Sequence, residues 1–366
     1  MNIVLAGGGT TGHIAPLIAT AEALRAIDPE LGLSCVGTPI GLERTVVPAA
    51  GLELDYVDPV PLPRTASLKL VSLPFRLLKA VHQASSILKA RQAQAVVGFG
   101  GYASLPVFLA ARWRRVPLVV HEANAVAGLA NRIGARFAAT TCVTFSNTGL
   151  KNQVVTGMPV RAAIAGLDRQ GLRAQARQKF SLPEGGPVLL VSGGSQGARS
   201  LNESLVGALP ALDAAGISVL HVTGAKNFEE SVPTSVSQHS RYVRLAYVDR
   251  MDLAYAAADL MLARSGAGTV TETAIVGLPT IFVPLPHGNG EQAKNAASLI
   301  EADAGIMIHD ADLTSETLAA QVVSLVTEPG RLESMSQRLR DLMPPDSARR
   351  VADLTLDAAR GNHASR

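Results

Sequence analysis

Two consecutive strand-to-helix turns in the second half of the chain carry residue types that could bind a phosphorylated sugar. The apolar strand Leu260 to Ala263 is followed by the turn Arg264-Ser265-Gly266-Ala267 and by a helix that carries Glu272. Small residues let the backbone approach an anion, and the free N–H groups at the start of a helix favour a phosphate there. The Glu272 carboxylate, about one helical turn further on, could accept hydrogen bonds from sugar hydroxyls.

The second of these turns leads to a helix that carries side-chain amides. The strand Thr280 to Val283 ends at a proline and leads into a loop with His287 and Asn289, and the helix that follows carries Gln292 and Asn295. Residues three apart lie on the same face of a helix, so the two amide side chains should point the same way. The two turns are therefore predicted to converge on one phosphorylated sugar.

A glycine-rich turn in the first half places a histidine where it could act as a base. The strand Ile3 to Ala6 is followed by Gly7-Gly8-Gly9-Thr10-Thr11-Gly12-His13 and then by a helix. His13 could simply bond to nearby backbone, or its imidazole could deprotonate a hydroxyl near neutral pH. The glycine turns around it favour the second interpretation. His121 and Asn124 also follow a strand, with a structural and a functional role equally open.

The same turn fits two other nucleotide-binding patterns less well. Gly7, Gly9 and Gly12 match G-x-G-x-x-G. A dinucleotide site also needs an acidic residue at the end of the second strand to hold the ribose, and that strand ends Cys35-Val36-Gly37-Thr38. A P-loop needs a lysine where His13 stands. A nicotinamide cofactor is therefore not expected.

A third glycine turn and an arginine add to the predicted anion site. The turn Gly193-Gly194-Ser195-Gln196-Gly197-Ala198 lies between the strand Val188 to Val191 and a helix. It could be a tight packing turn, or it could bind phosphate through its backbone with the Ser195 hydroxyl added. Arg161 could cap a carbonyl or pair with a phosphate, and we favour the phosphate.

Metal ligands and disulfides are not expected. Asp310-Ala311-Asp312 resembles a metal-binding acidic pair only superficially, because Leu313-Thr314-Ser315-Glu316 follows it as a helix cap. No Cys/His cluster has zinc spacing. Cys35 and Cys142 lie in apolar, strand-like runs, which predicts buried free thiols.

Length and pattern predict two domains. The chain has 366 residues, of which 47% are hydrophobic, and strands alternate with helices in both halves, which indicates parallel sheets covered on both faces. We predict an α/β protein with two doubly wound, Rossmann-like domains, residues 1–160 and 161–345, joined near Gly157 to Arg161. A last helix should run from Ser347 to about Arg360. Ligands would bind in the cleft at the carboxyl ends of the strands.

The ends and the apolar runs suggest a cytoplasmic protein. The N-terminus leads directly into a strand, with no basic region before an apolar one. No apolar run reaches the roughly 18 residues that a membrane span needs. We therefore expect a cytoplasmic location.

The charge of the first half is one-sided. No Asp or Glu occurs between Pro59 and His121, whereas nine Lys and Arg residues do. Because the net charge is +3, the rest of the chain must carry 3 − 9 = −6. One end of the first half should therefore attract an anionic partner.

A helix in this acid-free stretch should carry more apolar residues than a core face needs. Between Leu68 and Lys89, one stripe at helical spacing would be buried, while Phe75, Leu78 and the separate Trp113 are left over beside cations. That combination suits an anionic membrane surface. Nucleic acid is not favoured, because aromatics are few and no binding motif occurs. The buried stripe consists of Leu77, Val81, Ala84 and Leu88, and the membrane patch of Lys69, Leu70, Phe75, Arg76, Leu78, Lys79, Trp113 and Arg114.

In order and spacing, these motifs resemble the MurG family of bacterial transferases, which add N-acetylglucosamine (GlcNAc) to undecaprenyl-pyrophosphoryl-N-acetylmuramyl-pentapeptide (lipid I) to form lipid II. The resemblance covers almost the whole chain. It rests on Gly8 to His13, Gly100-Gly101-Tyr102, His121-Glu122-Ala123-Asn124, Gly193 to Ala198, Arg264 to Ala267, and Gln292 with Asn295-Ala296. Two residues depart from the family pattern: Ala123 stands where Gln is usual, and Met158 where Asn is usual before Pro159.

The resemblance implies the GT-B glycosyltransferase fold, with UDP-GlcNAc in the C-terminal half, the lipid-linked acceptor in the N-terminal half, and residues 346–366 packed back on the N-terminal domain. Uracil would meet the backbone near Val248, and the ribose would meet Glu272. The implied catalytic residues are His13, Glu272, Tyr102 and His121, with no metal or other cofactor. The implied UDP-GlcNAc contacts are Thr10, Thr11, Gly12, Asn124, Arg161, Ser195, Val248, Ala267, Gly268, Thr269, Val270, Thr271, Glu272, Gln292 and Asn295.

The reaction that follows is an inverting transfer. The C4 hydroxyl of the muramyl sugar would attack the anomeric carbon of UDP-GlcNAc, with His13 as the base and helix N-termini after Gly194 and Gly266 stabilising UDP. The resemblance places it at the cytoplasmic face of the inner membrane, in peptidoglycan synthesis, cell shape and division, with other cell-wall synthesis proteins as further candidate partners. Two alternatives stay open: a UDP-GlcNAc 2-epimerase on the same fold, and a non-catalytic sugar-nucleotide-binding subunit.

Overall fold

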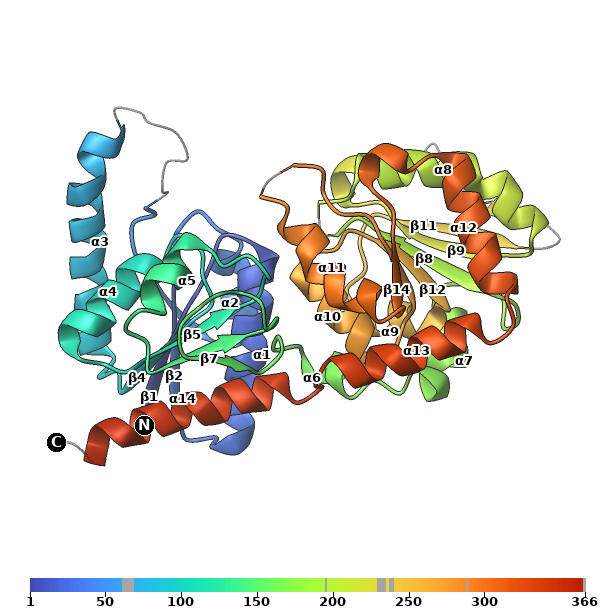
Figure 1. Cartoon of the computed structure of the whole chain (residues 1–366). Coiled ribbons are helices and arrows are strands. Elements are labelled where there is room, and N and C mark those ends of the chain that lie inside the picture. The colour runs from blue at the N-terminus through green and yellow to red at the C-terminus, as the bar shows by residue number, and fades with distance from the viewer. Residues whose placement is uncertain (61–68, 195, 229–234, 237–239, 288, 365–366) are drawn as a thin grey trace. The chain divides into compact units, whose positions relative to one another are not determined.

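The protein forms two compact units, each built on its own sheet (Figure 1). The computed structural model describes residues 1–60, 69–194, 196–228, 235–236, 240–287 and 289–364. Unit 1 comprises Met1–Ala162 and Pro345–Arg366, and unit 2 comprises Ala163–Pro344. The sequence had suggested boundaries after residues 160 and 345.

Unit 1 is a parallel sheet with the strand order β3-β2-β1-β4-β5-β6-β7 among the described residues. The order reverses between β1 and β4, which are direct neighbours, and ligands of such sheets bind at the carboxyl ends of the strands at this point. The strands are β1 (Asn2–Ala6), β2 (Gly32–Gly37), β3 (Glu53–Tyr56), β4 (Ala95–Gly98), β5 (Leu118–Glu122), β6 (Thr140–Val143) and β7 (Gln153–Val155).

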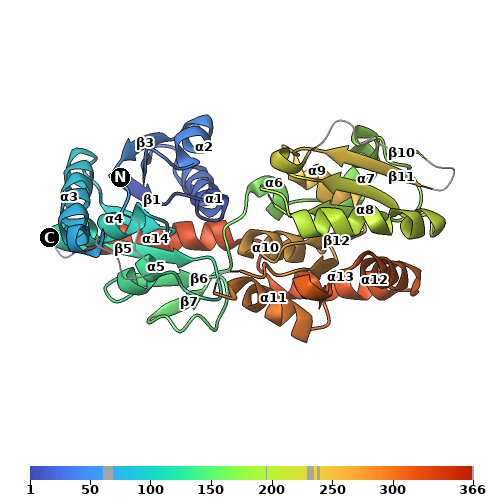
Figure 2. The same ribbon diagram turned by 90° about the horizontal axis from the view of Figure 1, so that it is seen from above.

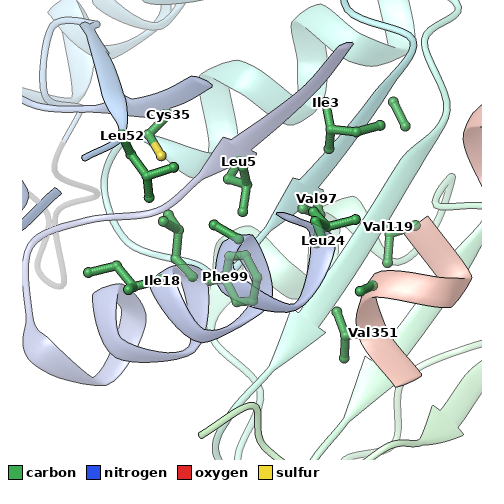
Figure 3. Packing of buried hydrophobic residues seen from close by; sticks show 14 of the residues in the cluster. Ile3, Leu5, Ile18, Leu24, Cys35, Leu52, Val97, Phe99, Val119 and Val351 are labelled. Atoms are coloured by element: carbon green, nitrogen blue, oxygen red, sulfur yellow. The ribbon is translucent and has the colours of Figure 1, made fainter. Parts of the chain in front are cut away.

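Helices cover both faces of this sheet, because its central strands are apolar on both sides. On one face Ile3 and Leu5 of β1 pack with Leu24 and with Val351 of the last helix, which lies against α1 in both overall views (Figures 1, 2 and 3). On the other face α3 and α4 pack together over the sheet. The helices of unit 1 are α1 (Thr11–Ile27), α2 (Glu43–Ala49), α3 (Lys69–Ala90), α4 (Ser104–Arg114), α5 (Leu129–Gly134) and α14 (Ser347–Ala364).

Unit 2 repeats the plan with the strand order β10-β11-β9-β8-β12-β13-β14 in the described part of the chain. All neighbours are parallel except β10 and β11. The order reverses between β8 and β12. The strands are β8 (Val188–Ser192), β9 (Ser218–Val222), β10 (Ser235–Val236), β11 (Arg241–Leu245), β12 (Leu260–Ala263), β13 (Thr280–Phe282) and β14 (Gly305–Met307).

The helices of unit 2 likewise bury two cores, one on each face of the sheet. The short α6 (Ala162–Ala165) crosses the boundary between the units. The others are α7 (Arg169–Lys179), α8 (Arg199–Ala214), α9 (Met251–Ala257), α10 (Ala267–Ile275), α11 (Glu291–Glu301), α12 (Ser315–Thr327) and α13 (Arg331–Leu342), with the 3-10 turns η1 (Ala225–Asn227) and η2 (Asp310–Asp312).

Several expectations about the fold are settled. The two parallel α/β sheets are as predicted. Cys35 and Cys142 are free and buried. The edge strand β3 and the helix α2 were not anticipated, since β3 is short and half-exposed and shows no clear alternation. Over the described residues, no helix is both long enough and apolar enough for a membrane span.

Candidate active site

Several of the predicted site residues lie at the two points where the strand order reverses. In unit 1 Gly7–His13 form the loop after β1 and the start of α1, Phe99–Tyr102 lie in the loop after β4, and Ala6 and Gly98 are register partners. In unit 2 the loops after β8 and β12 follow the partners Ser192 and Ala263. Each unit therefore presents its glycine turns side by side at one edge of its sheet.

The turn after β12 presents unbonded amides at a helix start. Gly266 is the extended N-cap of α10, and the first helical hydrogen bond runs from Val270 N to Gly266 O at 3.0 Å. The three residues between them thus have amides without an intrahelical acceptor, which suits a phosphate. These are Ala267, Gly268 and Thr269 of the predicted contacts. The side chains of Val270 and Thr271 are fully buried, so the predicted contact of these two residues with the donor stays a prediction for their backbone atoms alone.

Arg264 ties this turn to its neighbours. Its guanidinium donates to the carbonyls of Val283 and Pro284 at 3.2 Å each, and it forms an ion pair with Asp310 at 2.5 Å. Ser200 joins the group, accepting from Arg264 at 2.8 Å and donating to Asp310 at 2.7 Å. One arginine therefore links the loops that follow β12, β13 and β14 with the first turn of α8.

The same contacts explain the acidic pair at Asp310 and Asp312. The Asp310 carboxylate is engaged by Arg264 and Ser200, and Thr314 caps α12 with a reciprocal capping box, as the sequence predicted. Among the residues that the structure describes, no group of three or more His, Cys, Asp or Glu is arranged to hold a metal ion.

The two amides of α11 have different surroundings. Gln292 is half-buried, and its side-chain oxygen accepts from Leu285 N at 3.0 Å. Asn295 is fully buried and donates to Ser265 O at 3.2 Å. Asn295 therefore holds the turn before α10 in place, and the prediction that its side chain contacts the donor is corrected. His287 and Asn289 are exposed in the loop before α11.

Glu272 is half-buried on α10, one turn beyond the free amides. Its Oε2 accepts a hydrogen bond of 2.6 Å from the hydroxyl of Tyr255 on α9. Val248, where the uracil was expected, is half-buried and packs against the core cluster that also contains Tyr255. The carboxylate thus has a defined orientation beside the helix start.

The turn after β8 is a second helix start with unbonded amides. Gly194 and Gly197 have φ of +81° and +72°, and a Cβ on Gly197 would lie 2.2 Å from Thr223 O, so glycine is required there. The first helical bond of α8 runs from Asn202 N to Ala198 O at 3.0 Å. Ser195, predicted to add a hydroxyl, lies outside the described residues.

In unit 1 the backbone sets the tautomer of His13. Its Nδ1 lies 3.1 Å from Gly8 O and 3.3 Å from Thr10 Oγ1. A carbonyl oxygen only accepts, so Nδ1 carries the hydrogen and the lone pair of the neutral ring is on Nε2. The ring is half-exposed, and the neighbouring Thr10, Thr11 and Gly12 are exposed. This is the arrangement that a general base requires.

Two further glycines press against this turn. Gly100 and Gly101 have φ of +92° and +91°. A Cβ on Gly101 would lie 2.2 Å from Gly8 O, and one on Gly100 would lie 3.1 Å from His13 Nε2. Tyr102, the next residue in the chain, is 52% exposed. The backbone of Gly100 therefore lies directly against the His13 ring.

A buried carboxylate accepts hydrogen bonds from the glycine turn of unit 1 and from the residue that follows β2. Glu43 of α2 is fully buried and accepts from Gly9 N, Thr38 N and Thr38 Oγ1 at 2.8 Å each. Burial alone would raise the pKa of Glu43, but these hydrogen bonds outweigh it and hold the pKa below its ordinary value. An acid does lie beside the end of the second strand, but it is enclosed and cannot hold a ribose. The dinucleotide alternative therefore stays unsupported.

His121 does not have the position that its predicted catalytic role requires. It was predicted to be catalytic, but it is fully buried, 5.7 Å from the Phe99 ring, and Nε2 donates to Gly157 O at 3.1 Å. Burial therefore removes it from direct contact with a substrate. It instead anchors the segment Gly157 to Arg161, in which Arg161 itself is exposed.

Glu122, next to His121, has a structural arrangement that the sequence did not reveal. Its buried carboxylate accepts from Asn124 N, Gly128 N and Asn131 Nδ2 at 2.8–2.9 Å. Burial raises the pKa of Glu122 above its ordinary value. The carboxylate shapes the loop after β5, and it leaves Asn124 half-exposed.

The buried His121 predicts a loss of stability in acid. Burial lowers its pKa from 6.5 to about 4, so below pH 6.5 the unfolded chain takes up the proton more readily than the folded one. Between pH 6.5 and 4 this removes about 3 kcal/mol of folding free energy. We expect His121→Gln to flatten the pH dependence of urea unfolding in that range.

The control is the exposed His309, whose change to Gln should leave the pH dependence intact. Burial also lowers the pKa of His221 to about 4. His221 therefore still contributes its own part of the loss of folding free energy in acid in both variants. An unchanged slope in His121→Gln would show that His121 does not cause the acid loss.

A separate candidate surface lies on α3 and α4. The stripe Leu77, Val81, Ala84 and Leu88 packs into the core as predicted. Phe75, Leu78 and Trp113 are 76%, 66% and 63% exposed. Lys79, however, pairs with Asp58 at 2.7 Å, so part of the predicted positive charge is neutralised by an acid just outside the acid-free stretch.

The rest of this surface is polar and basic. A hollow of about 490 Å³ between α3 and α4 is lined by His82, Ser85, Ser86, Lys89, Trp113 and Arg114. Arg76 donates to Pro59 O at 3.0 Å. Lys69 and Leu70 lie at the start of α3, and their side chains are outside the described part. Exposed apolar groups and cations are therefore adjacent on one helix pair.

Comparison with known proteins gives the class. The profile of the glycosyltransferase family 28 N-terminal domain matches residues 3–143, and that of the family 28 C-terminal domain matches residues 188–351. Together these matches span most of the chain and both reversal points. The chain is a glycosyltransferase of family 28.

Full-length relatives narrow this to one family. The chain is 49% identical over 364 residues to a Nocardioides protein, covering 100% of both chains, and 50% identical over 365 residues to one from Mycolicibacterium smegmatis, covering 98% of this chain and 94% of that one. Both relatives are named UDP-N-acetylglucosamine–N-acetylmuramyl-(pentapeptide) pyrophosphoryl-undecaprenol N-acetylglucosamine transferase. The chain belongs to this family, as the motifs predicted.

Solved structures agree on the fold. The crystal structure of Acinetobacter baumannii MurG is 29% identical, covers 97% of this chain and 99% of its own, and superposes with a TM-score of 0.77. A UDP-GlcNAc 2-epimerase from Neisseria meningitidis, bound to UDP-GlcNAc, has a TM-score of 0.67 over 98% of this chain and 100% of its own, but only 13% identity. This second likeness shows the fold alone.

Proposed function

We propose that this enzyme transfers GlcNAc from UDP-GlcNAc to the C4 hydroxyl of the muramyl sugar of lipid I, with inversion, to form lipid II. Its full-length relatives carry the name of this transferase. The observation that carries the proposal is in unit 2, where α8 and α10 follow neighbouring strands and begin with amides that have no intrahelical acceptor, and where α10 also carries the oriented carboxylate of Glu272. That pattern offers one subsite for a pyrophosphate and another for a ribose.

Unit 1 supplies the base in this proposal. The C4 hydroxyl loses its proton to Nε2 of His13, the oxygen attacks the anomeric carbon of GlcNAc, and the bond from that carbon to UDP breaks. Gly8 O keeps the Nδ1 hydrogen in place and stabilises the imidazolium that forms. Tyr102, exposed beside His13, is available to contact the acceptor.

In unit 2 the leaving UDP takes the negative charge. The amides at the starts of α8 and α10 and their helix dipoles would stabilise it without a metal ion. Arg161, which is exposed, is a further candidate for the phosphates. The Asp310 carboxylate is already occupied by Arg264. We therefore expect the initial rate to stay within about twofold after EDTA treatment, measured as UDP release. A loss that added Mg²⁺ or Mn²⁺ restores would contradict this prediction.

The function is tested by incubating the protein with UDP-GlcNAc and a short-chain lipid I. Release of UDP together with the disaccharide lipid is expected only when both substrates are present. UDP-ManNAc formed without acceptor would identify an epimerase. Binding of UDP-GlcNAc with no UDP released in the presence of lipid I would identify a binding subunit. Either result overturns the proposal.

We also propose that the surface of α3 and α4 rests on an anionic membrane and that the enzyme works at the cytoplasmic face of the inner membrane, where lipid I would be its acceptor. Exposed Phe75, Leu78 and Trp113 would insert at the headgroup level, and the nearby cations would meet lipid phosphates. Its product would feed peptidoglycan synthesis, and so cell shape and division. Other cell-wall synthesis proteins are further candidate partners.

Removing these apolar groups should release the protein from vesicles. Because burying one large apolar side chain contributes about 1.5–3 kcal/mol, Phe75→Ser with Leu78→Ser should weaken binding to phosphatidylglycerol vesicles at least about tenfold. Cosedimentation measures this. Val206→Ser, at an exposed position of unit 2, is the control and should bind normally. Unchanged binding of the double variant would place the membrane surface elsewhere.

A further inference from the structure

Tyr255 has a contact that the proposed reaction does not explain. It is buried on α9, only 2% exposed, yet its hydroxyl reaches the neighbouring helix and donates to Glu272 Oε2 at 2.6 Å. A carboxylate has no hydrogen of its own, so the tyrosine is the donor, and hydrogen bonds to a charged acceptor are short and strong. One oxygen of the Glu272 carboxylate is thereby fixed.

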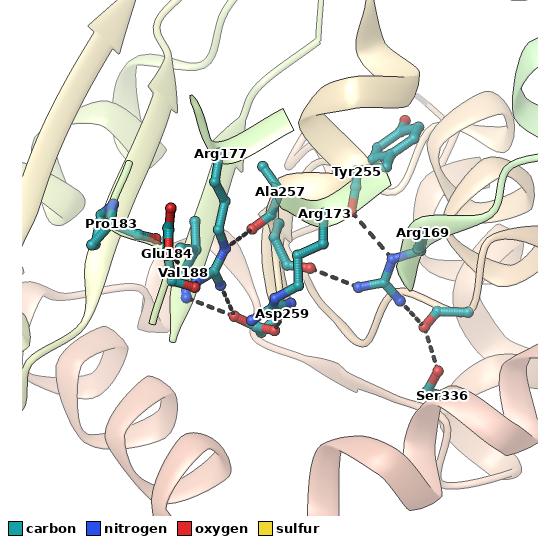
Figure 4. A network of polar contacts seen from close by, with 12 residues as sticks. Arg169, Arg173, Arg177, Pro183, Glu184, Val188, Tyr255, Ala257, Asp259 and Ser336 are labelled. Carbon is teal, nitrogen blue, oxygen red and sulfur yellow. Dashed lines mark hydrogen bonds and ion pairs between the residues drawn. The ribbon is translucent and has the colours of Figure 1, made fainter. Parts of the chain in front are cut away.

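The two helices that carry these residues share one anchor. Arg169, the first residue of α7, donates to Tyr255 O at 3.2 Å and to Ala258 O at 2.6 Å, both at the carboxyl end of α9. The same guanidinium donates to Gly277 O at 2.6 Å, just beyond the end of α10 (Figure 4). A cation at a helix carboxyl end is favourable, because the helix dipole is negative there.

This anchor is reinforced from a second side. Ser336 of α13 donates to the same carbonyl of Gly277 at 2.6 Å. Further along α7, Arg177 donates to Ala257 O at 3.2 Å. The carboxyl ends of α9 and α10 are therefore fixed relative to each other, and with them the distance between the Tyr255 hydroxyl and the Glu272 carboxylate.

We propose that Tyr255 is a positioning residue that sets the rotation of the Glu272 carboxylate, and that it thereby makes the enzyme select a ribonucleotide donor over a deoxyribonucleotide. The inference rests on the proposed role of Glu272 as acceptor for the ribose hydroxyls. A carboxylate with a fixed plane accepts from a vicinal diol in one geometry only. A sugar without its 2′-hydroxyl leaves that acceptor unpaired, which is where discrimination arises.

The test compares UDP-GlcNAc with its 2′-deoxyuridine counterpart. Native enzyme should prefer the ribonucleotide in kcat/KM by at least about tenfold, the size expected for a hydrogen bond to a charged group. Tyr255→Phe should lose most of this preference through a higher KM for UDP-GlcNAc, with kcat within about twofold. Glu272→Ala should lose it entirely.

Tyr242→Phe is the matched control. The Tyr242 hydroxyl is also buried in unit 2, but it lies 2.8 Å from Nδ1 of His221. Loss of this hydroxyl should lower the stability of the protein about as much as Tyr255→Phe does. It should leave the ribose preference at the native value. Should Tyr255→Phe fold poorly, Arg169→Lys keeps the cation but loses the fork that reaches both helices, and it should lower the preference in the same direction.

The outcomes separate the two ideas. If Glu272→Ala loses the ribose preference while Tyr255→Phe and Arg169→Lys both keep it, the positioning role of Tyr255 is wrong and the ribose site stands. If Glu272→Ala keeps the preference, the proposed ribose site itself is wrong.

Discussion

Changing His13 to alanine is expected to lower kcat by about 10²–10⁴, the usual contribution of a positioned general base, while the affinity for UDP-GlcNAc stays near normal. The physical reason is local. Nδ1 is held by Gly8 O at 3.1 Å, so the lone pair of Nε2 is the proton acceptor that is lost. Single-turnover transfer and UDP-GlcNAc titration measure the two quantities separately.

His309→Ala, in an exposed turn of unit 2, is the control and should transfer at the native rate. Near-normal turnover of His13→Ala, with the donor still bound, would assign the proton to another group.

Changing Asp259 to asparagine is expected to destabilise unit 2 by about 3–5 kcal/mol, because it leaves a buried cation without its counter-charge. The Arg177 side chain is fully buried and lies 2.9 Å from Asp259 Oδ2. The same oxygen accepts from Val188 N at 2.9 Å, and Oδ1 pairs with Arg173 at 2.6 Å (Figure 4). Urea unfolding followed by a probe in unit 2 measures the loss.

The chain offers a close match for the control. Asp303 also lies between two arginines, Arg331 and Arg338, but its side chain is 53% exposed. Exposed pairs contribute little, so Asp303→Asn should cost less than about 1 kcal/mol. Asparagine also tolerates the φ of +54° at that position. Equal losses in the two variants would mean that burial of Arg177 is not the cause.

The main features of both units could be predicted because their signals are local. An apolar run, a glycine turn and a helix mark each reversal point, at Gly7–His13 in unit 1 and at Arg264–Ala267 in unit 2. The exposure of Phe75 and Leu78 also follows from helical spacing, which leaves them outside the buried stripe of α3.

The parts that could not be predicted depend on partners distant in the sequence. Glu43 holds Gly9 from 34 positions away, and Arg264 meets Asp310 across 46. His121 was assigned to catalysis from its place at a strand end, because no local pattern reports that a ring there is enclosed by Phe99 and Gly157.

The close approach of Gly101 to Gly8 links two stretches of sequence that lie far apart in the chain. A methyl group at position 101 would push against the very carbonyl that keeps the hydrogen on Nδ1 of His13. A change this small would therefore affect the proposed reaction by disturbing the tautomer of His13. Because the two backbones are in contact, substitutions in one loop are tolerated during evolution only with matching changes in the other. A redesign of one loop must therefore include the other.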